Sequence, residues 1–581
     1  MNKSNFHIIR MLLAIALLTA AVLPMQADYS KSQPGRNTRY NRHGSDVCVI
    51  EINQQGSVEQ YFTRHDMEAV RLLVVNGPIT RDDIKFIKKI ANRSHAYADE
   101  QHSKKVDNYL DVDLSHAVMM NNKELFGSMN GCDHLRSIIL PEFTRRIESN
   151  ALSGCRNLEE VIMPSDVRII GDAAFDDCTH LQDIYLENSI QEIGNRAFNG
   201  CKRIKSLFLP RDLKRIGDQA FSGTGLREIQ LPDNLKEMSG NAFAGTDISQ
   251  IEIPAGCSIK GSFNEMSALQ YIEVESGSRY YRSDNGLLMN LDGTALLCCP
   301  PALKGSMALK DGIQVIADKA FMGCHGLTAI ELAESITAVG EDAFNGCSGL
   351  QAIEFKAPAS FGKNAFANCT SLLDFDFGGD IAGALPMGLF EGCTRLQEIT
   401  LPDNVRAIPR YCFRGCSMLG DIDLPEGLSV IERGAFKGTA LTSVELPASV
   451  AAIEKDAYNE CRRLVEFTAG TGLTTIGEEA FNNCESLARV TLNEGLATIE
   501  SKAFNNCALT TLTIPGTVSH IGKNIVDKNK GLTSITCLAP LPPKLDKASN
   551  DKVQLLVPAA SVNSYKQAKN WKNYRNIAPI E

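Results

Sequence analysis

One pattern of apolar and polar positions recurs along most of the chain, with Phe175, Phe198 and Phe221 at equivalent places in successive units. Each unit holds a segment of the form Leu-x-x-Ile-x-Leu-Pro, as in Leu226–Pro232, whose alternation has the period of a strand. The proline ends that strand because it has no N–H to donate. The rest of the unit reads Ile-Gly-x-x-Ala-Phe-x-x-Cys-x-x-Leu, which is too short for an independent helix. We therefore expect it to form a turn that packs Ala, Phe and Cys inward.

A single unit cannot bury its apolar side alone, whereas stacked units bury a continuous core. The sequence holds seventeen strand segments of this form between Leu135 and Cys537. Stacking would place them in parallel register about 4.7 Å apart. The predicted fold class is an α/β repeat, a solenoid over residues 125–540 with a parallel concave sheet.

The segment before the array, residues 47–124, is predicted to form an N-terminal cap domain. Val47–Ile52, Val70–Val75 and Tyr109–Leu114 read as strands. Thr80–Asp83 resembles a capping box, with Asp where Glu is usual, and predicts the start of a helix.

Two further segments depart from the repeat. Within residues 281–300, Asn285-Gly286 and Asp292-Gly293 interrupt apolar runs, which predicts a β-hairpin inserted into one coil. Residues 541–581 predict a C-terminal cap made of one strand, Val553–Pro558, and a short helix.

The N-terminus has the pattern of a secretory signal peptide over residues 1–27. Lys3 and Arg10 supply positive charge, and the apolar run Met11–Leu23 is shorter than a membrane span. Residues 28–46 are polar and lack periodicity, which predicts a disordered leader. We expect no transmembrane segment and an exported protein, located outside the cell, at the cell surface or in the periplasm.

These repeats resemble the BspA-like leucine-rich repeat proteins of bacterial cell surfaces. The resemblance covers residues 125 to 537 and rests on more than a dozen copies of the pattern. It implies a leucine-rich-repeat solenoid and adhesion to host matrix proteins or to other cells.

Most of the cysteines occupy one position of the repeat, which admits three interpretations: metal ligation, disulfide staples, or a small buried residue. Thr224, Thr246 and Thr439 stand at the same position, and threonine neither bridges nor ligates a soft metal. A ladder also supplies one ligand per coil, whereas zinc needs four that converge. We therefore predict buried thiols, no metal and no cofactor. The ladder comprises Cys132, Cys155, Cys178, Cys201, Cys324, Cys347, Cys369, Cys393, Cys416, Cys461, Cys484 and Cys507.

Composition and motifs argue against two other functions. The chain has 59 Lys and Arg against 69 Asp and Glu, a net charge of −10, which is the wrong sign for a broad nucleic-acid footprint. It shows no nucleophile elbow, Walker loop or H-E-x-x-H motif. We expect no enzyme activity and assign no catalytic residue.

The residues flanking the central Ile of each strand should point outward. Of these thirty-four positions, fourteen are acidic and one, Arg489, is basic. The acids either keep a wide sheet soluble or form a groove for a basic partner or for Ca²⁺ between coils. The acidic ligand-binding candidates are Glu228, Glu252, Glu273, Glu331, Glu354, Asp374, Asp376, Asp421 and Asp423.

The first four strands instead carry apolar residues at one outward position: Ile139, Ile162, Tyr185 and Phe208. Register would align them as an apolar strip, which marks an interaction site unless the cap or residues 93–106 fold over it.

The sequence thus predicts a secreted or surface-exposed protein that recognises host matrix proteins or proteins of neighbouring cells, with a basic partner favoured by the acidic face. The alternatives are a structural or glycan-binding component of the envelope, or a periplasmic scaffold. The oligomeric state is not encoded in any pattern.

Overall fold

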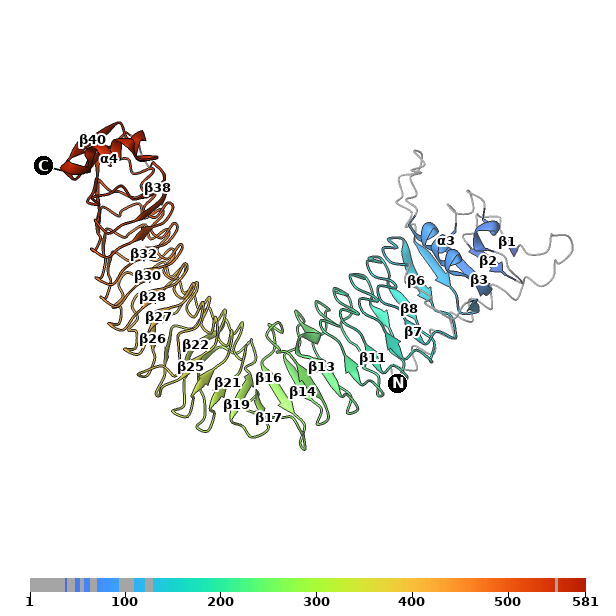
Figure 1. Ribbon diagram of the computed structural model, residues 1–581. Coiled ribbons are helices and arrows are strands. Elements are labelled where there is room, and N and C mark those ends of the chain that lie inside the picture. Colours follow the sequence, from blue (N-terminus) through green and yellow to red (C-terminus); the bar gives the residue numbers. More distant parts are fainter. Residues whose placement is uncertain are drawn as a thin grey trace, which may run out of the picture. The chain divides into compact units, whose positions relative to one another are not determined.

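The computed structural model describes residues 37–38, 47–52, 57–62, 70–92, 109–120, 129–548 and 552–580. The chain forms two compact units, one ending at Glu187 and the other beginning at Asn188 (Figure 1). The predicted signal peptide, residues 1–27, lies outside the described residues, as does all of the predicted leader except Asn37 and Thr38.

The first unit opens with a small parallel sheet in the region predicted as a cap. Strands β2 (Val47–Glu51), β3 (Leu72–Ile79) and β4 (Leu110–Asp113) lie side by side, which confirms the three predicted strands. Three shorter elements complete this region: β1 (Asn37–Thr38), antiparallel to β2, β5 (Ala117–Met119), parallel to β3, and the 3-10 turn η2 (Val58–Tyr61).

Helix α3 (Arg81–Ala91) begins as predicted, with a complete capping box. The Thr80 hydroxyl accepts from the Asp83 N–H at 3.3 Å, and the Asp83 carboxylate accepts from the Thr80 N–H at 2.8 Å. The same carboxylate accepts from the Val58 N–H at 2.6 Å. One buried aspartate therefore holds both the start of α3 and η2 in place.

The repeats of both units form a first row of parallel strands from the Leu-x-x-Ile-x-Leu segments, as predicted. In the first unit these are β6 (Leu135–Ile139), β8 (Glu160–Ile162) and β10 (Asp183–Ile184). In the second unit they are β14 (Gln250–Ile253), β16 (Tyr271–Val274), β22 (Leu327–Glu331), β24 (Ala352–Glu354), β26 (Asp374–Asp376), β29 (Ser443–Glu445), β31 (Glu466–Thr468), β33 (Arg489–Thr491), β35 (Thr511–Ile514) and β37 (Ser534–Cys537).

Four of the seventeen predicted strands are absent as regular strands: residues 206–208, 228–230, 398–400 and 421–423. The apolar residue that precedes each of these segments is nevertheless buried, as Leu226 is, whereas the central residue is half-buried in three of the four: Leu207, Ile229 and Ile422. The apolar side chains of the pattern therefore pack inward there, although the backbone does not form a regular hydrogen-bonded ladder.

A second row of parallel strands, which the sequence did not predict, runs through the Ile-Gly segments. In the first unit it comprises β7 (Arg146–Ile147) and β9 (Ile169–Ile170). In the second unit it comprises β11 (Glu192–Ile193), β12 (Arg215–Ile216), β13 (Glu237–Ser239), β15 (Ser258–Lys260), β21 (Val315–Ile316), β23 (Ala338–Val339), β25 (Ser360–Phe361), β27 (Ala407–Ile408), β28 (Val430–Ile431), β30 (Ala452–Ile453), β32 (Thr475–Ile476), β34 (Thr498–Ile499), β36 (His520–Lys523) and β38 (Lys544–Lys547).

The phenylalanines of the repeat stack on one another through the core of the second unit. The Phe321 and Phe344 rings are 4.7 Å apart and inclined by 8°, and the stack continues from coil to coil as far as Phe504. The repeated glycine permits this spacing, because a Cβ on Gly217 would lie 2.5 Å from the backbone nitrogen of Asn195 in the coil before it.

The predicted hairpin is present and carries one more strand. Strands β17 (Tyr281–Asp284) and β18 (Leu287–Asn290) are antiparallel, joined by Asn285 and Gly286, which both have positive φ. Strand β19 (Ala295–Cys298) pairs with β18 and then, in parallel, with β21. The insertion therefore returns the chain to the second row of strands. After the insertion, β20 (Gly305–Ala308) pairs in parallel with β22, and the 3-10 turn η3 (Gly240–Phe243) lies in an earlier coil.

The C-terminal cap contains the predicted strand and helix. Trp571 is buried, and its indole N–H donates to the Pro543 carbonyl at 2.7 Å. The Tyr565 hydroxyl donates to the Ala539 carbonyl at 2.8 Å. Both bonds tie the last turns of the chain to the segment between β37 and β38. Its elements are β39 (Gln554–Val557), η4 (Ala559–Ser561), α4 (Val562–Gln567), η5 (Trp571–Asn573) and a strand that was not predicted, β40 (Asn576–Pro579).

We predict that Trp571→Ala destabilises the C-terminal end by about 3–5 kcal/mol, because truncating a buried aromatic residue leaves a cavity. Hydrogen exchange should then speed up in β37 and β39, while Trp571→Phe, which keeps a ring, has a smaller effect. Unchanged exchange in the alanine variant would contradict the role of Trp571 in closing the stack.

Candidate functional site

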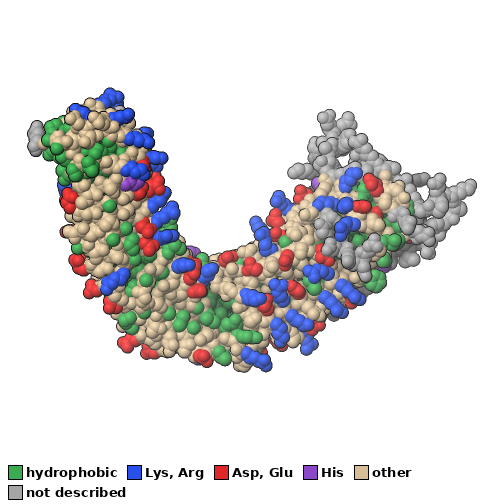
Figure 2. All heavy atoms as spheres, in the orientation of Figure 1, with side chains coloured by type: hydrophobic (Ala, Val, Ile, Leu, Met, Phe, Trp, Pro, Cys, Tyr) green, Lys and Arg blue, Asp and Glu red, His purple; other side chains and the backbone are tan. Residues whose placement is uncertain are grey.

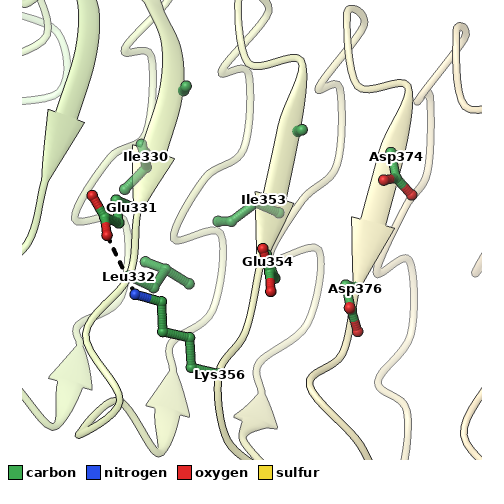
Figure 3. Close-up of a pocket in the computed structure, with 10 residues that line it drawn as sticks. Ile330, Glu331, Leu332, Ile353, Glu354, Lys356, Asp374 and Asp376 are labelled. Atoms are coloured by element: carbon green, nitrogen blue, oxygen red, sulfur yellow. Dashed lines mark hydrogen bonds and ion pairs between the residues drawn. The ribbon is translucent and has the colours of Figure 1, made fainter.

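Strands β22, β24 and β26 place three of the predicted acids in one row. Glu354 is in register with Asp376, and the pairing of Ala329 with Ala352 sets Glu331 beside Glu354. Side chains two residues apart on a strand share a face, so these acids and the alanines project from the same side. Figure 3 shows the three carboxylates along one level of three neighbouring strands.

A hollow of about 450 Å³ opens on this face. The exposed alanines at 329 and 352 leave it open, since a larger side chain at either position would occupy the space. Asp374 lies in register with Ala352 and stands at one end of the hollow. The hollow is lined by Ala329, Ile330, Glu331, Leu332, Ala352, Ile353, Glu354, Lys356, Asp374 and Asp376 (Figure 3).

The charges around the hollow are unbalanced. The Lys356 ammonium lies 3.3 Å from a Glu331 carboxylate oxygen. Within the described part of the chain, no basic side chain forms an ion pair with Glu354, Asp374 or Asp376. A peptide N–H, that of Gly378, donates to Asp376 at 2.8 Å.

Some acids on other strands are paired, on the first row as well as on the second. On the first row, Arg489 of β33 contacts Glu466 of β31 at 2.8 Å. On the second row, Arg215 contacts both Glu192 and Glu237, and Lys260 contacts Glu237 at 2.8 Å. The hydrogen bond from Lys260 lowers the pKa of Glu237, with Arg215 adding to the effect. Acidic and basic side chains are intermingled over much of the face drawn in Figure 2.

The other acidic candidates point outward but do not line the hollow. Glu252 and Glu273 are exposed and in register on β14 and β16. Glu228, Asp421 and Asp423 are exposed on coils that lack a regular strand. The structure thus gathers Glu331, Glu354, Asp374 and Asp376 at one place and leaves the remaining candidates elsewhere on the chain.

The apolar candidates also face outward. Ile139 and Ile162 are in register on β6 and β8 and are half-buried. Tyr185 follows β10 in the same unit and is 52% exposed. Phe208 belongs to the second unit and is 79% exposed. The predicted covering loop, residues 93–106, lies outside the described residues.

Lys356 is the member of this site that the sequence analysis missed. It lies one residue beyond the Leu-x-x-Ile-x-Leu pattern, outside the two outward positions of the strand. The sequence does set Lys356 apart, because it stands where many repeats have the proline that follows the strand.

The repeated cysteines are buried, as predicted. Many donate a thiol hydrogen bond to the preceding coil, as Cys347 does to the Phe321 carbonyl at 3.1 Å. At the same repeat position, the Thr224 hydroxyl donates to the Phe221 carbonyl at 2.8 Å. Threonine therefore replaces cysteine because both fill the space and satisfy a turn carbonyl. Cys298 and Cys299, on the hairpin insertion, are buried as well.

A metal site requires several grouped ligands, and a membrane span requires a long apolar helix. The described residues concerned are 37–38, 47–52, 57–62, 70–92, 109–120, 129–548 and 552–580. Within those residues, no three His, Cys, Asp or Glu side chains are grouped so that they could hold a metal ion. The helices seen in the same part of the chain are all too short or too polar to cross a membrane.

The stacked coils with their parallel strands define a leucine-rich repeat solenoid. The family model described as BspA type leucine rich repeat region (6 copies) matches residues 125–213, 191–285, 303–384, 383–484 and 452–543. These matches span more than half of the chain, which therefore belongs to the BspA-type leucine-rich repeat family.

Solved structures of similar repeat proteins come from several bacteria. A leucine rich cell surface protein of Faecalibacterium prausnitzii is 20% identical, with 79% of this chain and 95% of that one covered and a TM-score of 0.36. A leucine-rich repeat protein of Bacteroides ovatus is 21% identical over 68% and 86%, with a TM-score of 0.33. The pneumococcal vaccine antigen PcpA is 15% identical over 92% and 95%, with a TM-score of 0.25. No curated protein sequence matches the chain.

The buried thiols predict a loss of stability in alkali. Burial raises the pKa of Cys257, Cys298 and Cys507 from 9.0 to about 12. Since the folded pKa exceeds the unfolded one, the stabilisation is complete below pH 9 and is lost as the pH rises toward 12. Each such thiol should lower the free energy of unfolding by about 1.4 kcal/mol per pH unit in that range.

Urea unfolding at pH 8 and pH 10 measures this loss, and Cys507→Thr is the matched variant because threonine occupies the same position in three coils. The variant should lose less stability between the two pH values than the parent chain does. Equal losses would show that the Cys507 thiol does not titrate as its burial requires.

Proposed function

We propose that this chain is an exported binding protein that acts at the cell surface or outside the cell. In this role it recognises host matrix proteins or proteins of neighbouring cells in the manner of an adhesin. Membership of the BspA-type family supports a binding scaffold, and the signal-peptide pattern of residues 1–27 supports export. The partner surface is the outward face of the first row of strands.

The observation that carries the proposal is the hollow across β22, β24 and β26, where Glu354, Asp374 and Asp376 form no ion pair within the described residues. Acids placed side by side at strand spacing repel one another. On the second row the chain relieves such repulsion with Arg215 and Lys260, whereas Glu354, Asp374 and Asp376 have no such partner within the described residues. A basic partner would remove this repulsion, and its approach would be steered by the same charges.

The proposal assigns the hollow to binding and not to catalysis. A carboxyl group that acts as a general acid is normally buried among apolar side chains, which keeps it protonated. Glu331, Glu354 and Asp376 are all exposed to solvent. The alanines between them offer contact area but no nucleophile.

The apolar candidates belong to the same proposal as additional contacts. Aromatic side chains are common anchors at protein interfaces. The exposure of Tyr185 in the first unit and of Phe208 in the second leaves each ring available to a partner. Ile139 and Ile162 would contact the partner together with Tyr185.

We predict that the triple variant Glu331→Gln, Glu354→Gln and Asp376→Asn weakens binding to basic matrix proteins about tenfold at low salt. Binding by the parent chain should fall as ionic strength rises, because salt screens exposed charges. Surface plasmon resonance on immobilised matrix proteins of different net charge measures both effects.

The control removes three exposed acids that do not line the hollow: Glu334→Gln, Asp403→Asn and Glu426→Gln. It changes the net charge equally and should bind like the parent chain. The proposal fails if the hollow variant binds normally, or if the control loses as much affinity.

A further inference from the structure

The hollow combines an apolar floor with a charged rim. The Ala329 and Ala352 side chains are exposed and in register, so their methyl groups form adjacent parts of the floor. Glu331, Glu354 and Asp376 follow along the rim (Figure 3). Long basic side chains bury an aliphatic stem on apolar surface while their charged end stays in water. The hollow has the features that such a side chain requires.

Lys356 already makes this kind of contact from within the chain. Its stem lines the hollow, and its ammonium reaches back by one coil to Glu331 at 3.3 Å. The lysine side chain is 38% exposed and the glutamate 69% exposed. An exposed ion pair of this kind is weak, so a ligand can displace it.

Two of the acids are also regularly spaced along one strand. Asp374 and Asp376 are alternate residues of β26 and project from the same face. An extended peptide that lies along the strand direction has the same two-residue period. Its alternate side chains would therefore meet these two carboxylates in step.

We propose that the hollow across β22, β24 and β26 binds an extended peptide segment with basic residues at alternate positions, and that Lys356 competes with this ligand for Glu331. The inference rests on the proposed function and adds the form of the ligand and an internal competitor. Charge complementarity and the matching period select this ligand. Lys356 lowers the affinity for it and thereby restricts binding to segments with several basic residues.

The test uses the full chain and a fluorescein-labelled peptide, Arg-Gly-Arg-Gly-Arg, with fluorescence anisotropy at low ionic strength. Lys356→Met should bind this peptide about threefold more tightly, because a weak internal ion pair no longer has to be broken. The double variant Glu354→Gln and Asp376→Asn should bind it severalfold more weakly. A peptide of the same composition, Gly-Arg-Arg-Arg-Gly, should bind less tightly than the alternating one.

Lys363→Met is the matched control for charge, because Lys363 is exposed on the turn that follows β25 and does not line the hollow. Thermal unfolding of each variant checks that the fold is kept. In the Glu331→Gln background, Lys356→Met should bring no further gain in affinity, since the competing pair is already broken.

The outcomes distinguish the competitor role of Lys356 from the binding role of the acidic face. If Lys356→Met binds no more tightly than Lys363→Met, the competitor role is overturned, while weaker binding by the Glu354 and Asp376 variant would still support the acidic face. If that variant binds the peptide normally, the hollow is not the site, and the proposed function fails with it. Equal binding of the two peptides would overturn the alternating ligand, as would equally tight binding of spermidine.

Discussion

Every coil of this protein depends on its neighbours, because one repeat is too small to bury its own apolar side. The contact between coils is made by residues that recur at fixed positions. The Phe321 and Phe344 rings stack, the Cys347 thiol donates to the Phe321 carbonyl, and Gly217 lets neighbouring backbones approach closely. Where these positions differ between coils, the replacement is similar in size and in hydrogen bonding, as Thr224 is for cysteine. The outward positions of the strands do not make these core contacts between coils, so the residues there differ more from coil to coil.

Charged side chains are arranged differently on the second row of strands and on β22, β24 and β26. On the second row, acids alternate with Arg215 and Lys260, so neighbouring coils attract one another. On β22, β24 and β26 the acids stand beside alanines and acids. Lys356 relieves one end of this row only. The side chains of the described residues thus leave a local repulsion in place, and a basic ligand would relieve it.

Much of the fold could be predicted from the sequence, because the signals were local and repeated. The period set by Phe175 and its equivalents indicated the stacking, Thr80 and Asp83 indicated the start of α3, and Asn285-Gly286 indicated the hairpin turn. The second row of strands was missed because pairs such as Ile169–Ile170 are too short to show an alternation. The outward direction of Glu331 and Glu354 followed from the strand period. The hollow could not be predicted from the strand period. It depends on which acids lie beside alanines on neighbouring strands, and on a lysine at the position where other repeats have a proline.

Photo-cross-linking tests the central claim most directly, because it reports where a basic ligand lies. A peptide with alternating arginines and a terminal benzophenone would be irradiated with the full chain, and the cross-linked residues identified by mass spectrometry. The account predicts cross-links concentrated in residues 327–332, 351–357 and 373–379, which disappear at high salt. Cross-links concentrated on the second row of strands, or spread evenly over the exposed acids, would contradict it.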